Sequence, residues 1–301
     1  FSPQAASRLQ SVLGLQTWNS IRATDFLESL PDVDKKRLAV TGASGGGTQS
    51  MILAAVEPRI ALSVPAVMVS TAMQGGCTCE NCSLMRVGTG NVEFAALFAP
   101  KPQMVTAAND WTKEMATKGF PELHRLYGLL GAKNQVKLHS RIEYGHNYNY
   151  VSRAAMYHWV NHHFALGHPT PIIEKEIVRS TLAEMTVWDD EHPQPEGGDE
   201  FERRLLQHWD DDANDQLTAL RPQDAQSFQK YQAVVGAGID AIVGRGLPDA
   251  TDPEYDQTEK FDRGDYIEIM GLLRNKPQGE ELPLVFYHPK QWEGQVVIWI
   301  D

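Results

Sequence analysis

Residues 37–56 read Arg-Leu-Ala-Val-Thr-Gly-Ala-Ser-Gly-Gly-Gly-Thr-Gln-Ser-Met-Ile-Leu-Ala-Ala-Val, and this stretch decides the fold. Its first part, Arg37–Thr41, predicts a short buried strand, and its last part, Thr48–Val56, predicts a helix. The glycine-rich bend between them contains the pattern Gly-x-Ser-x-Gly, with Ser44 at the centre. A bend this tight needs small residues on both sides of the serine, and it pushes the serine hydroxyl outward.

Strands and helices continue to alternate after this bend. The predicted strands and helices are, in chain order, the strands Ile60–Val64 and Gln103–Ala107, the helix Pro121–Leu130, the strand Val136–Ile142 and the helix Tyr150–Leu166. A helical stretch with an interruption at Gly14 is expected before the bend, from Pro3 to Leu30. Strands that alternate with helices predict a mostly parallel sheet covered on both faces.

The chain changes character near residue 170. The stretch Asp189–Glu202 is acidic and rich in proline and glycine, as linkers are. Later segments predict two helices and then a β-hairpin, at Phe201–Leu220, Ala225–Val243, Leu282–His288 and Gln295–Ile300. We therefore expect an α/β part over residues 1–170, a helical connector over 171–280 and new strands over 281–301.

Composition narrows the class of protein. Hydrophobic residues make up 42% of the 301 residues, which is typical of a globular protein with a core. The formal net charge of −12 argues against a nucleic-acid partner, because phosphate binding needs a basic surface. The sequence contains no run of about 18 apolar residues, so it predicts no membrane-spanning helix. The chain begins Phe-Ser-Pro, without an initiator methionine or a signal peptide, so we expect a processed or excised piece of a longer protein.

Ser44 is the candidate nucleophile, because a serine in a tight strand-to-helix turn is the arrangement that serine hydrolases use. The backbone N–H of Gly45 would then be one donor to the oxyanion. Two other interpretations fit the same turn: a serine that merely caps the helix, or a phosphate-binding loop. The absence of a lysine after the glycines and of a Gly-x-Gly-x-x-Gly pattern weakens the nucleotide interpretation.

A serine nucleophile needs a base and an orienting acid. Asp110 follows one predicted strand and His146 follows the next, in the chain order Ser, Asp, His. Asp110 also fits a helix cap, and Glu143 is a possible substitute acid. The histidines within predicted helices or strands are weaker candidates for the base; they are His124, His139, His158, His162 and His163.

Two other groups of residues suggest metal sites only weakly. Cys77, Cys79 and Cys82 lack a fourth ligand for zinc, so a disulfide or free thiols are the better interpretations, and a disulfide would indicate an oxidising compartment. The aspartates at positions 210–212 and Asp215 fit a solvated helix face better than a calcium loop. No metal and no cofactor is expected.

With these residues placed, the sequence resembles the acetyl xylan esterase-like branch of the α/β-hydrolases, in its large tandem form from planctomycete-like bacteria. The matching stretches are Leu15–Arg22, Val40–Gln49, Met73–Asn81, Ala108–Thr112 and Tyr144–Asn149. The resemblance implies a Ser44–His146–Asp110 triad, no cofactor, ester substrates on polysaccharides and export to the periplasm or the cell exterior. It also implies a second hydrolase-like unit, whose connector and first strands residues 172–301 resemble.

The sequence departs from this family at its start. A complete α/β-hydrolase has several strands before the nucleophile turn, and a loop after the third strand supplies the second oxyanion donor. Here the turn comes at Ser44, so those strands are missing unless the C-terminal strands, of this chain or of a neighbour, replace them. The expected function is hydrolysis of acetyl or related esters by an acyl-enzyme mechanism. A peptidase or lactone hydrolase on the same scaffold, or a non-catalytic carbohydrate-binding module, are the alternatives.

Overall fold

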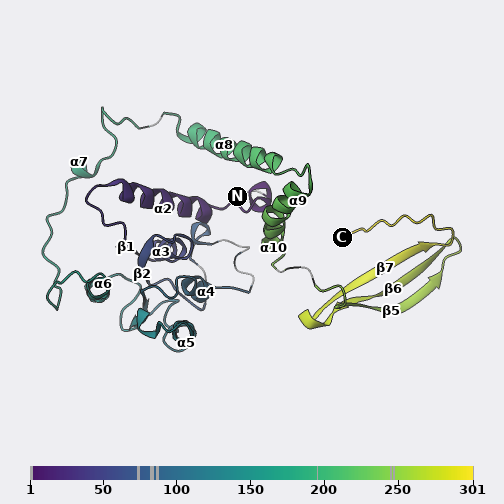
Figure 1. The fold of residues 1–301 in the computed structure, drawn as a ribbon, viewed down its shortest axis with the longest axis horizontal. Coiled ribbons are helices and arrows are strands. Elements are labelled where there is room, and N and C mark those ends of the chain that lie inside the picture. The colour runs from purple at the N-terminus through teal and green to yellow at the C-terminus, as the bar shows by residue number, and fades with distance from the viewer. Residues whose placement is uncertain are drawn as a thin grey trace. The chain divides into compact units, whose positions relative to one another are not determined.

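A parallel sheet of four strands organises the first part of the molecule (Figure 1). The computed structural model describes residues 3–72, 75–81, 85, 88–194, 196–244, 246 and 248–300. They form two compact units, Phe1–Gly244 and Arg245–Asp301. In the first unit the strand order is β1-β2-β3-β4, with β1 (Leu38–Ala43) at one edge, followed by β2 (Ile60–Ala66), β3 (Gln103–Ala108) and β4 (Val136–Arg141). The predicted parallel sheet is confirmed.

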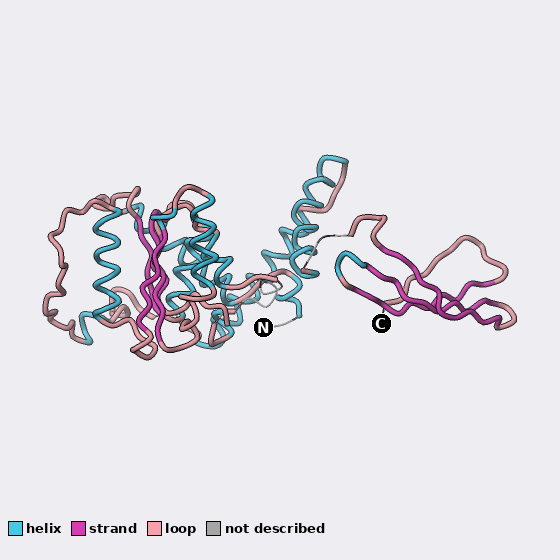
Figure 2. Tube along the Cα trace, turned by 90° about the horizontal axis from the view of Figure 1, so that it is seen from below, coloured by secondary structure: helices cyan, strands magenta, loops and turns pink. Residues whose placement is uncertain are grey.

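Helices cover both faces of this sheet (Figure 2). One face packs against α3 (Gly45–Val56), α4 (Asn91–Ala96) and α5 (Gly119–Leu129), and the other against α6 (Tyr150–His163). Met51 of α3 and Tyr127 of α5 are fully buried in the core of the first face. On the opposite face, Trp159 of α6 packs in one cluster with Leu62 and Met104 of the sheet. Burial of such side chains is the main stabilising term of the fold.

The N-terminal helical stretch is interrupted earlier than the sequence suggested. It consists of α1 (Pro3–Ser7) and α2 (Val12–Ser29), so the break lies before Val12 and Gly14 is inside the first turn of α2. The prediction of a break at Gly14 is wrong because Ser11 caps the helix: its Oγ accepts a hydrogen bond from the Gly14 N–H at 3.0 Å.

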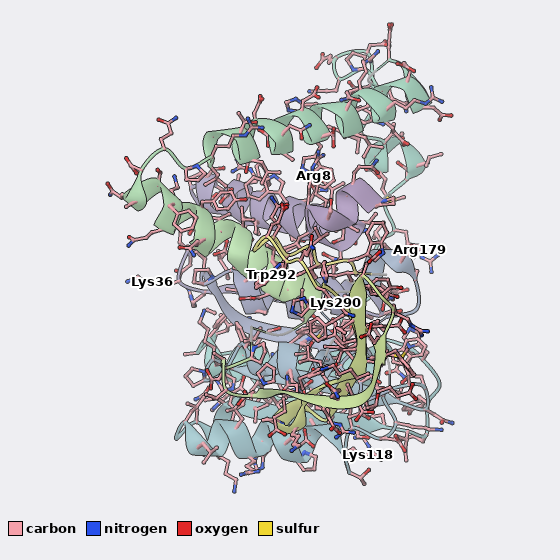
Figure 3. The ribbon with its side chains drawn as sticks, turned by 90° about the vertical axis from the view of Figure 1, so that its right-hand side faces the viewer. Arg8, Lys36, Lys118, Arg179, Lys290 and Trp292 are labelled. Carbon is pink, nitrogen blue, oxygen red and sulfur yellow. A yellow bond between two sulfur atoms is a disulfide. The ribbon has the colours of Figure 1, made fainter. Side chains whose placement is uncertain are left out.

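The residues after α6 in the first unit are loop apart from one short helix up to Gln194, and they are mostly helical from Gly198 onward, where two helices were predicted. They form α7 (Leu182–Met185), α8 (Gly198–Ala219), α9 (Ala225–Tyr231), the π-helical turn η4 (Gln232–Gly236) and α10 (Ala237–Val243). Arg8, between α1 and α2, reaches α8 (Figure 3), where it pairs with Asp210 and donates a hydrogen bond to Asn214 at 2.6 Å. Among the described residues, no group of three histidine, cysteine or acidic side chains is arranged to hold a metal ion.

The second unit is an antiparallel sheet of three strands, β5 (Pro253–Asp262), β6 (Tyr266–Asn275) and β7 (Glu280–Pro289). The predicted C-terminal antiparallel pairing is present, but its strands differ from those expected. β7 contains the predicted strand Leu282–His288, yet it pairs with β6, and Gln295–Ile300 is not a strand. β5 and β6 fall in the range that we expected to be helical. These three strands form a sheet of their own, distinct from that of β1–β4.

The short 3₁₀ turns of the chain connect these elements. η3 (Lys133–Gln135) leads into β4, and η5 (Lys276–Gln278) joins β6 to β7. Over the part of the chain that the structure describes, no helix has the length and apolar character needed to cross a bilayer.

Glu174 fastens the segment after α6 to that helix. Its carboxylate accepts hydrogen bonds from Arg153 Nε at 2.6 Å, Arg153 Nη2 at 2.8 Å and the Tyr157 hydroxyl at 2.6 Å. The Arg153 guanidinium and then the Tyr157 hydroxyl lower the pKa of Glu174 from the ordinary 4.5 to about 2. Because the folded-state pKa is the lower one, the stabilisation is present above the ordinary value and is lost as the pH falls toward 2.

We therefore expect the ¹³C resonance of the Glu174 carboxyl group to titrate with a midpoint near pH 2. In the Arg153→Gln variant the midpoint should rise toward the ordinary 4.5, because the guanidinium is the first cause of the lowered pKa. An ordinary midpoint in the unsubstituted protein would contradict this contact.

The turn around Ser44 offers a paired stability test. A Cβ added at Gly42 would collide with the backbone of Gly46, with its carbonyl carbon only 2.6 Å away, whereas a Cβ at Gly46 meets nothing within 4 Å. Gly42→Ala should therefore lower the free energy of unfolding by about 1–3 kcal/mol. Gly46→Ala should leave it unchanged or raise it by up to about 1 kcal/mol, because alanine favours the helix.

Denaturant unfolding of the two variants measures this difference. Equal stability of Gly42→Ala and Gly46→Ala would show that the backbone does not approach itself closely in this turn.

Candidate active site

The candidate site lies at the side of the parallel sheet where the carboxyl ends of its four strands meet. Ser44 follows β1, Ser70 follows β2, Asp110 follows β3 and His146 follows β4. Because the carboxyl ends of parallel strands meet at the same edge, residues distant in the sequence converge there. The predicted positions of Ser44, Asp110 and His146 just after strands are thus confirmed.

Ser44 lies between β1 and α3 in a strained backbone conformation, with φ of 58° and ψ of −123°. A non-glycine residue with positive φ is uncommon and persists only where its surroundings impose it. Its N–H donates a hydrogen bond to the Ala66 carbonyl at 3.1 Å. Gly47 must be a glycine, because a Cβ there would lie 2.7 Å from that same carbonyl oxygen. This close packing against the end of β2 enforces the turn that presents the hydroxyl.

The side chains of Asp110 and His146 are joined by a hydrogen bond of 2.7 Å between Asp110 Oδ2 and His146 Nδ1. The Asp110 side chain is only 5% exposed, while that of His146 is 35% exposed. The other oxygen, Oδ1, accepts hydrogen bonds from the Thr112 N–H at 2.7 Å and the Thr112 hydroxyl at 2.5 Å. Asp110 therefore both caps the turn after β3 and holds the imidazole. Glu143, the other possible acid, lies near Arg141, with 3.4 Å between their side chains.

Further hydrogen bonds tie the loops of this edge together. The Asn109 N–H donates to the Tyr144 carbonyl at 2.8 Å, which joins the loops after β3 and β4. The Ser70 hydroxyl donates to the Trp111 carbonyl at 2.6 Å, which joins the loops after β2 and β3. The Trp111 ring also packs on the His146 ring, with 4.5 Å between their centroids. These contacts fix both the position and the tilt of the imidazole.

The structure joins Asp110 to His146, but it does not join His146 to Ser44. Within the described residues, no hydrogen bond links Ser44 Oγ to His146. Hydrogen bonds between a nucleophile and its base are often long without substrate and tighten when the complex forms. The pair His146–Asp110 is therefore the part of the site that the free protein already holds in place.

Gly45 is the first residue of α3, so its N–H belongs to the helix end whose donors have no partner inside the helix. This donor and the positive end of the helix can stabilise negative charge beside Ser44. A second donor from a strand loop before the turn, which a complete hydrolase has, is not found among the described residues, where β1 is the first strand and an edge strand.

Sequence reasoning missed Glu80, which lies beside the same turn. Glu80 ends the 3₁₀ turn η1 (Thr78–Glu80), in a loop where Cys77 and Cys79 form a disulfide. A Cβ added at Gly45 would lie 2.6 Å from Glu80 Oε1, so the carboxylate is close to the candidate oxyanion donor. The signal was present in the stretch Cys-x-Cys-Glu-Asn, but nothing in its spacing points to Ser44. Cys82, the third cysteine, lies outside the described residues.

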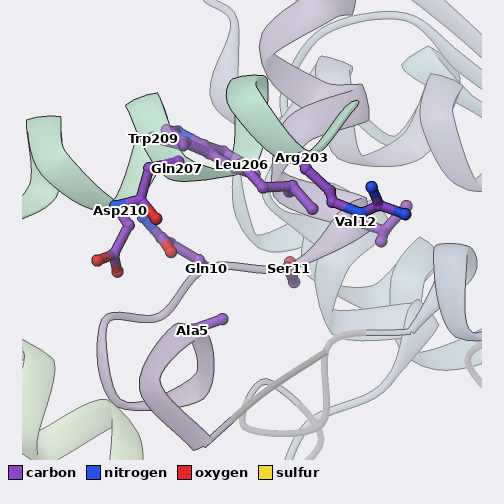
Figure 4. A pocket seen from close by; sticks show the side chains of 9 residues that line it. All are labelled: Ala5, Gln10, Ser11, Val12, Arg203, Leu206, Gln207, Trp209 and Asp210. Carbon is purple, nitrogen blue, oxygen red and sulfur yellow. The ribbon is translucent and has the colours of Figure 1, made fainter. Parts of the chain in front are cut away.

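A separate cavity of about 490 Å³ lies between the start of the chain and α8 (Figure 4). None of the three predicted catalytic residues lines it. Its walls combine apolar and polar side chains: Ala5, Gln10, Ser11, Val12, Arg203, Leu206, Gln207, Trp209 and Asp210. The candidate catalytic centre and this cavity are thus different parts of the first unit.

In a comparison with known protein families, residues 5–142 match the family model described as "Glucuronyl esterase, fungi". This range contains Ser44 and Asp110 and ends before His146. No curated protein matches the chain.

Solved structures also match. The chain is 34% identical to "Methylesterase BT1017", covering 52% of this chain and 36% of that one, with a TM-score of 0.49. It is 17% identical to a carbohydrate esterase family 15 glucuronoyl esterase from Caldicellulosiruptor kristjansonii, covering 57% and 55% of the two chains with a TM-score of 0.41. It is 20% identical to the glucuronoyl esterase catalytic domain from Hypocrea jecorina, covering 59% and 58% with a TM-score of 0.41. The chain thus spans from about a third to three fifths of these proteins.

Thr112 provides a test of how the acid is held. Thr112 is fully buried, and its hydroxyl donates to Asp110 and accepts from the Ala108 N–H at 3.0 Å. Thr112→Val keeps the shape of the side chain but removes the hydroxyl, which leaves two buried polar groups short of a partner. The substitution should therefore lower the free energy of unfolding by about 1–3 kcal/mol.

Thr112→Ser is the matched control, because it keeps the hydroxyl and loses only a methyl group. In denaturant unfolding, Thr112→Ser should lower the free energy of unfolding by less than Thr112→Val does. A larger loss for the serine variant would show that packing of the methyl group, and not the hydrogen bonds to Asp110 and Ala108, fixes this residue.

Proposed function

We propose that this chain carries the catalytic centre of a serine-dependent hydrolase that cleaves carboxylic esters of carbohydrates. The observation that supports this most strongly is the 2.7 Å hydrogen bond between Asp110 and His146, at the same sheet edge as the strained turn of Ser44. His146 combines a buried carboxylate on Nδ1 with a side chain that stays 35% exposed. That combination suits a general base.

In the proposed reaction, His146 Nε2 takes the proton of Ser44 Oγ while Oγ attacks the ester carbonyl carbon. The Gly45 N–H stabilises the negative oxygen of the tetrahedral intermediate, and His146 then gives its proton to the departing alcohol. Water, activated by the same imidazole, hydrolyses the acyl-serine. Asp110 holds the tautomer with the proton on Nδ1, and it stabilises the imidazolium in both steps. The nucleophile, base and acid for these steps all come from the protein.

The substrate class is supported by the comparisons and by the family resemblance. The matching family model is that of a glucuronyl esterase, and one matching structure is a methylesterase. The sequence also resembles acetyl xylan esterases. All three descriptions share a carboxylic ester, and they differ in whether the sugar lies on the acyl or on the alcohol side. We propose acetyl or related polysaccharide esters, with uronic acid esters as the second candidate because the family model favours them.

The setting proposed for the protein is outside the cytoplasm. A disulfide such as Cys77–Cys79 persists in oxidising compartments, which supports export to the periplasm or the cell exterior. The proposed partner is a polysaccharide ester, with neither nucleic acid nor membrane involved. We further propose that β5–β7 belong to a second hydrolase-like unit of the full-length protein.

Replacement of Ser44 tests the proposal directly. In the full-length protein, Ser44→Ala should lower kcat for an acetyl ester at least about 10⁴-fold, because the attacking atom is lost. Ser180→Ala, at an exposed serine after α6, should leave kcat unchanged. Undiminished turnover by Ser44→Ala would overturn the proposal.

The choice of substrate separates the remaining alternatives. Acetylated xylan oligomers, the methyl ester of glucuronic acid, a lactone and short peptides are compared by kcat/KM on the same protein. Preference for a peptide or the lactone would favour a peptidase or a lactone hydrolase on this scaffold. Glycan binding without labelling of Ser44 by a fluorophosphonate would favour a non-catalytic carbohydrate-binding module.

A further inference from the structure

A second carboxylate, that of Glu80, faces the turn that carries Ser44. Its Oε1 is 2.6 Å, and its carboxyl carbon 3.5 Å, from the place where a Cβ of Gly45 would be. Gly45 directly follows the candidate nucleophile and carries the candidate oxyanion donor. The Glu80 carboxylate therefore lies close to the place where the reacting carbonyl group of an ester would bind.

Backbone groups of the neighbouring glycines hold the Glu80 side chain in place. The Gly76 N–H donates to Glu80 Oε2 at 2.6 Å, which fixes one oxygen while the other faces Gly45. A Cβ at Gly75 would collide with the Cβ of Glu80, so the glycine on that side is required too. Glu80 is half-buried between the two glycines, and no ion pair within the described residues involves it. The carboxylate is thus held in place by backbone contacts, and in the described part of the chain no cationic side chain pairs with it.

The loop that carries Glu80 is braced on several sides. The Asn81 amide donates to the carbonyls of Gly75, at 3.0 Å, and Cys77, at 2.6 Å. The Cys77–Cys79 disulfide closes the turn directly before Glu80, and η1 packs against α2 and α3. A side chain on a braced loop keeps its charge in one position, as a specificity-determining residue must.

We propose that Glu80 determines the charge specificity of the site, by admitting neutral esters and repelling acyl groups and products that carry a carboxylate. This inference rests on the proposed function, and it names the substrate class. Like charges close together near a protein surface repel strongly enough to change a rate about tenfold or more. Hydrolysis of any ester frees a carboxylate at Ser44, so the same repulsion also favours release of the acid product.

A charge beside the oxyanion site opposes the developing oxyanion of every ester to a similar degree. This shared effect cancels in the ratio of kcat/KM between two esters. The ratio then reports only the effect of the charge on the acyl group. We would therefore compare the monomethyl ester of fumaric acid, which carries a free carboxylate that its trans double bond keeps away from the ester carbonyl, with the methyl ester of its monoamide, which has the same shape and is neutral.

The test uses the full-length protein and its Glu80→Gln variant, in which the side-chain amide oxygen can still accept from the Gly76 N–H. The unsubstituted protein should prefer the neutral ester, and Glu80→Gln should reduce that preference about tenfold. Glu122→Gln, at an exposed position in the first turn of α5, removes one carboxylate elsewhere and should leave the preference unchanged. Thermal unfolding of both variants checks that they fold.

Salt gives a second measurement on the same samples. Raising the ionic strength should weaken the preference in the unsubstituted protein and leave it almost unchanged in Glu80→Gln, because screening acts on the charge that the variant lacks. If Glu80→Gln slows both esters equally, Glu80 binds a neutral part of the substrate and the inference is overturned. If the unsubstituted protein hydrolyses neither ester and Ser44 resists a fluorophosphonate, the proposed function itself fails, and this inference falls with it.

Discussion

The hydrogen bond between Asp110 and His146 is the interaction on which the rest of the site depends. It joins the loops after β3 and β4, and every neighbouring contact acts on it: Thr112 holds the far oxygen of Asp110, and the Trp111 ring limits the tilt of the imidazole. The strands bring these loops together only because they are parallel and adjacent. The apolar core beneath these strands thus fixes the distance between Asp110 and His146, which lie 36 residues apart in the chain.

Two carboxylates at this sheet edge have different surroundings and, in our proposals, different uses. Asp110 is almost fully buried, and hydrogen bonds occupy both of its oxygens, so its charge acts on the imidazole. Glu80 is half-buried, has one oxygen held by a backbone N–H and directs the other to Gly45, so its charge acts on whatever approaches Ser44. The same chemical group therefore orients the base in one place and selects the substrate in the other. The residue that makes the second role possible is a glycine, because any larger side chain at position 45 would displace Glu80.

Local patterns predicted most of the first unit, and contacts between distant residues account for what they missed. The apolar runs that became β1–β4 and the glycines around Ser44 are signals within a few residues, and so are the strand-end positions of Asp110 and His146. β5, with the sequence Pro-Glu-Tyr-Asp-Gln-Thr-Glu-Lys-Phe-Asp, is too polar to indicate a strand by itself and becomes one only by pairing with β6. The apolar run Gln295–Ile300 lacks such a partner among the described strands and has no regular secondary structure. Glu80 was missed for the same reason, since its contact with Gly45 exists only in the folded chain.

The central claim is that Ser44, His146 and Asp110 act as one unit on an acyl group, and a crystal structure of the full-length protein after reaction with a fluorophosphonate tests it most directly. The account predicts a covalent bond from phosphorus to Ser44 Oγ and a phosphonyl oxygen within about 2.6–3.2 Å of the Gly45 N–H. It also predicts the His146 ring still bonded to Asp110, with Nε2 turned toward the adduct. An unmodified Ser44, or an adduct that the imidazole cannot reach while it stays bonded to Asp110, would contradict it.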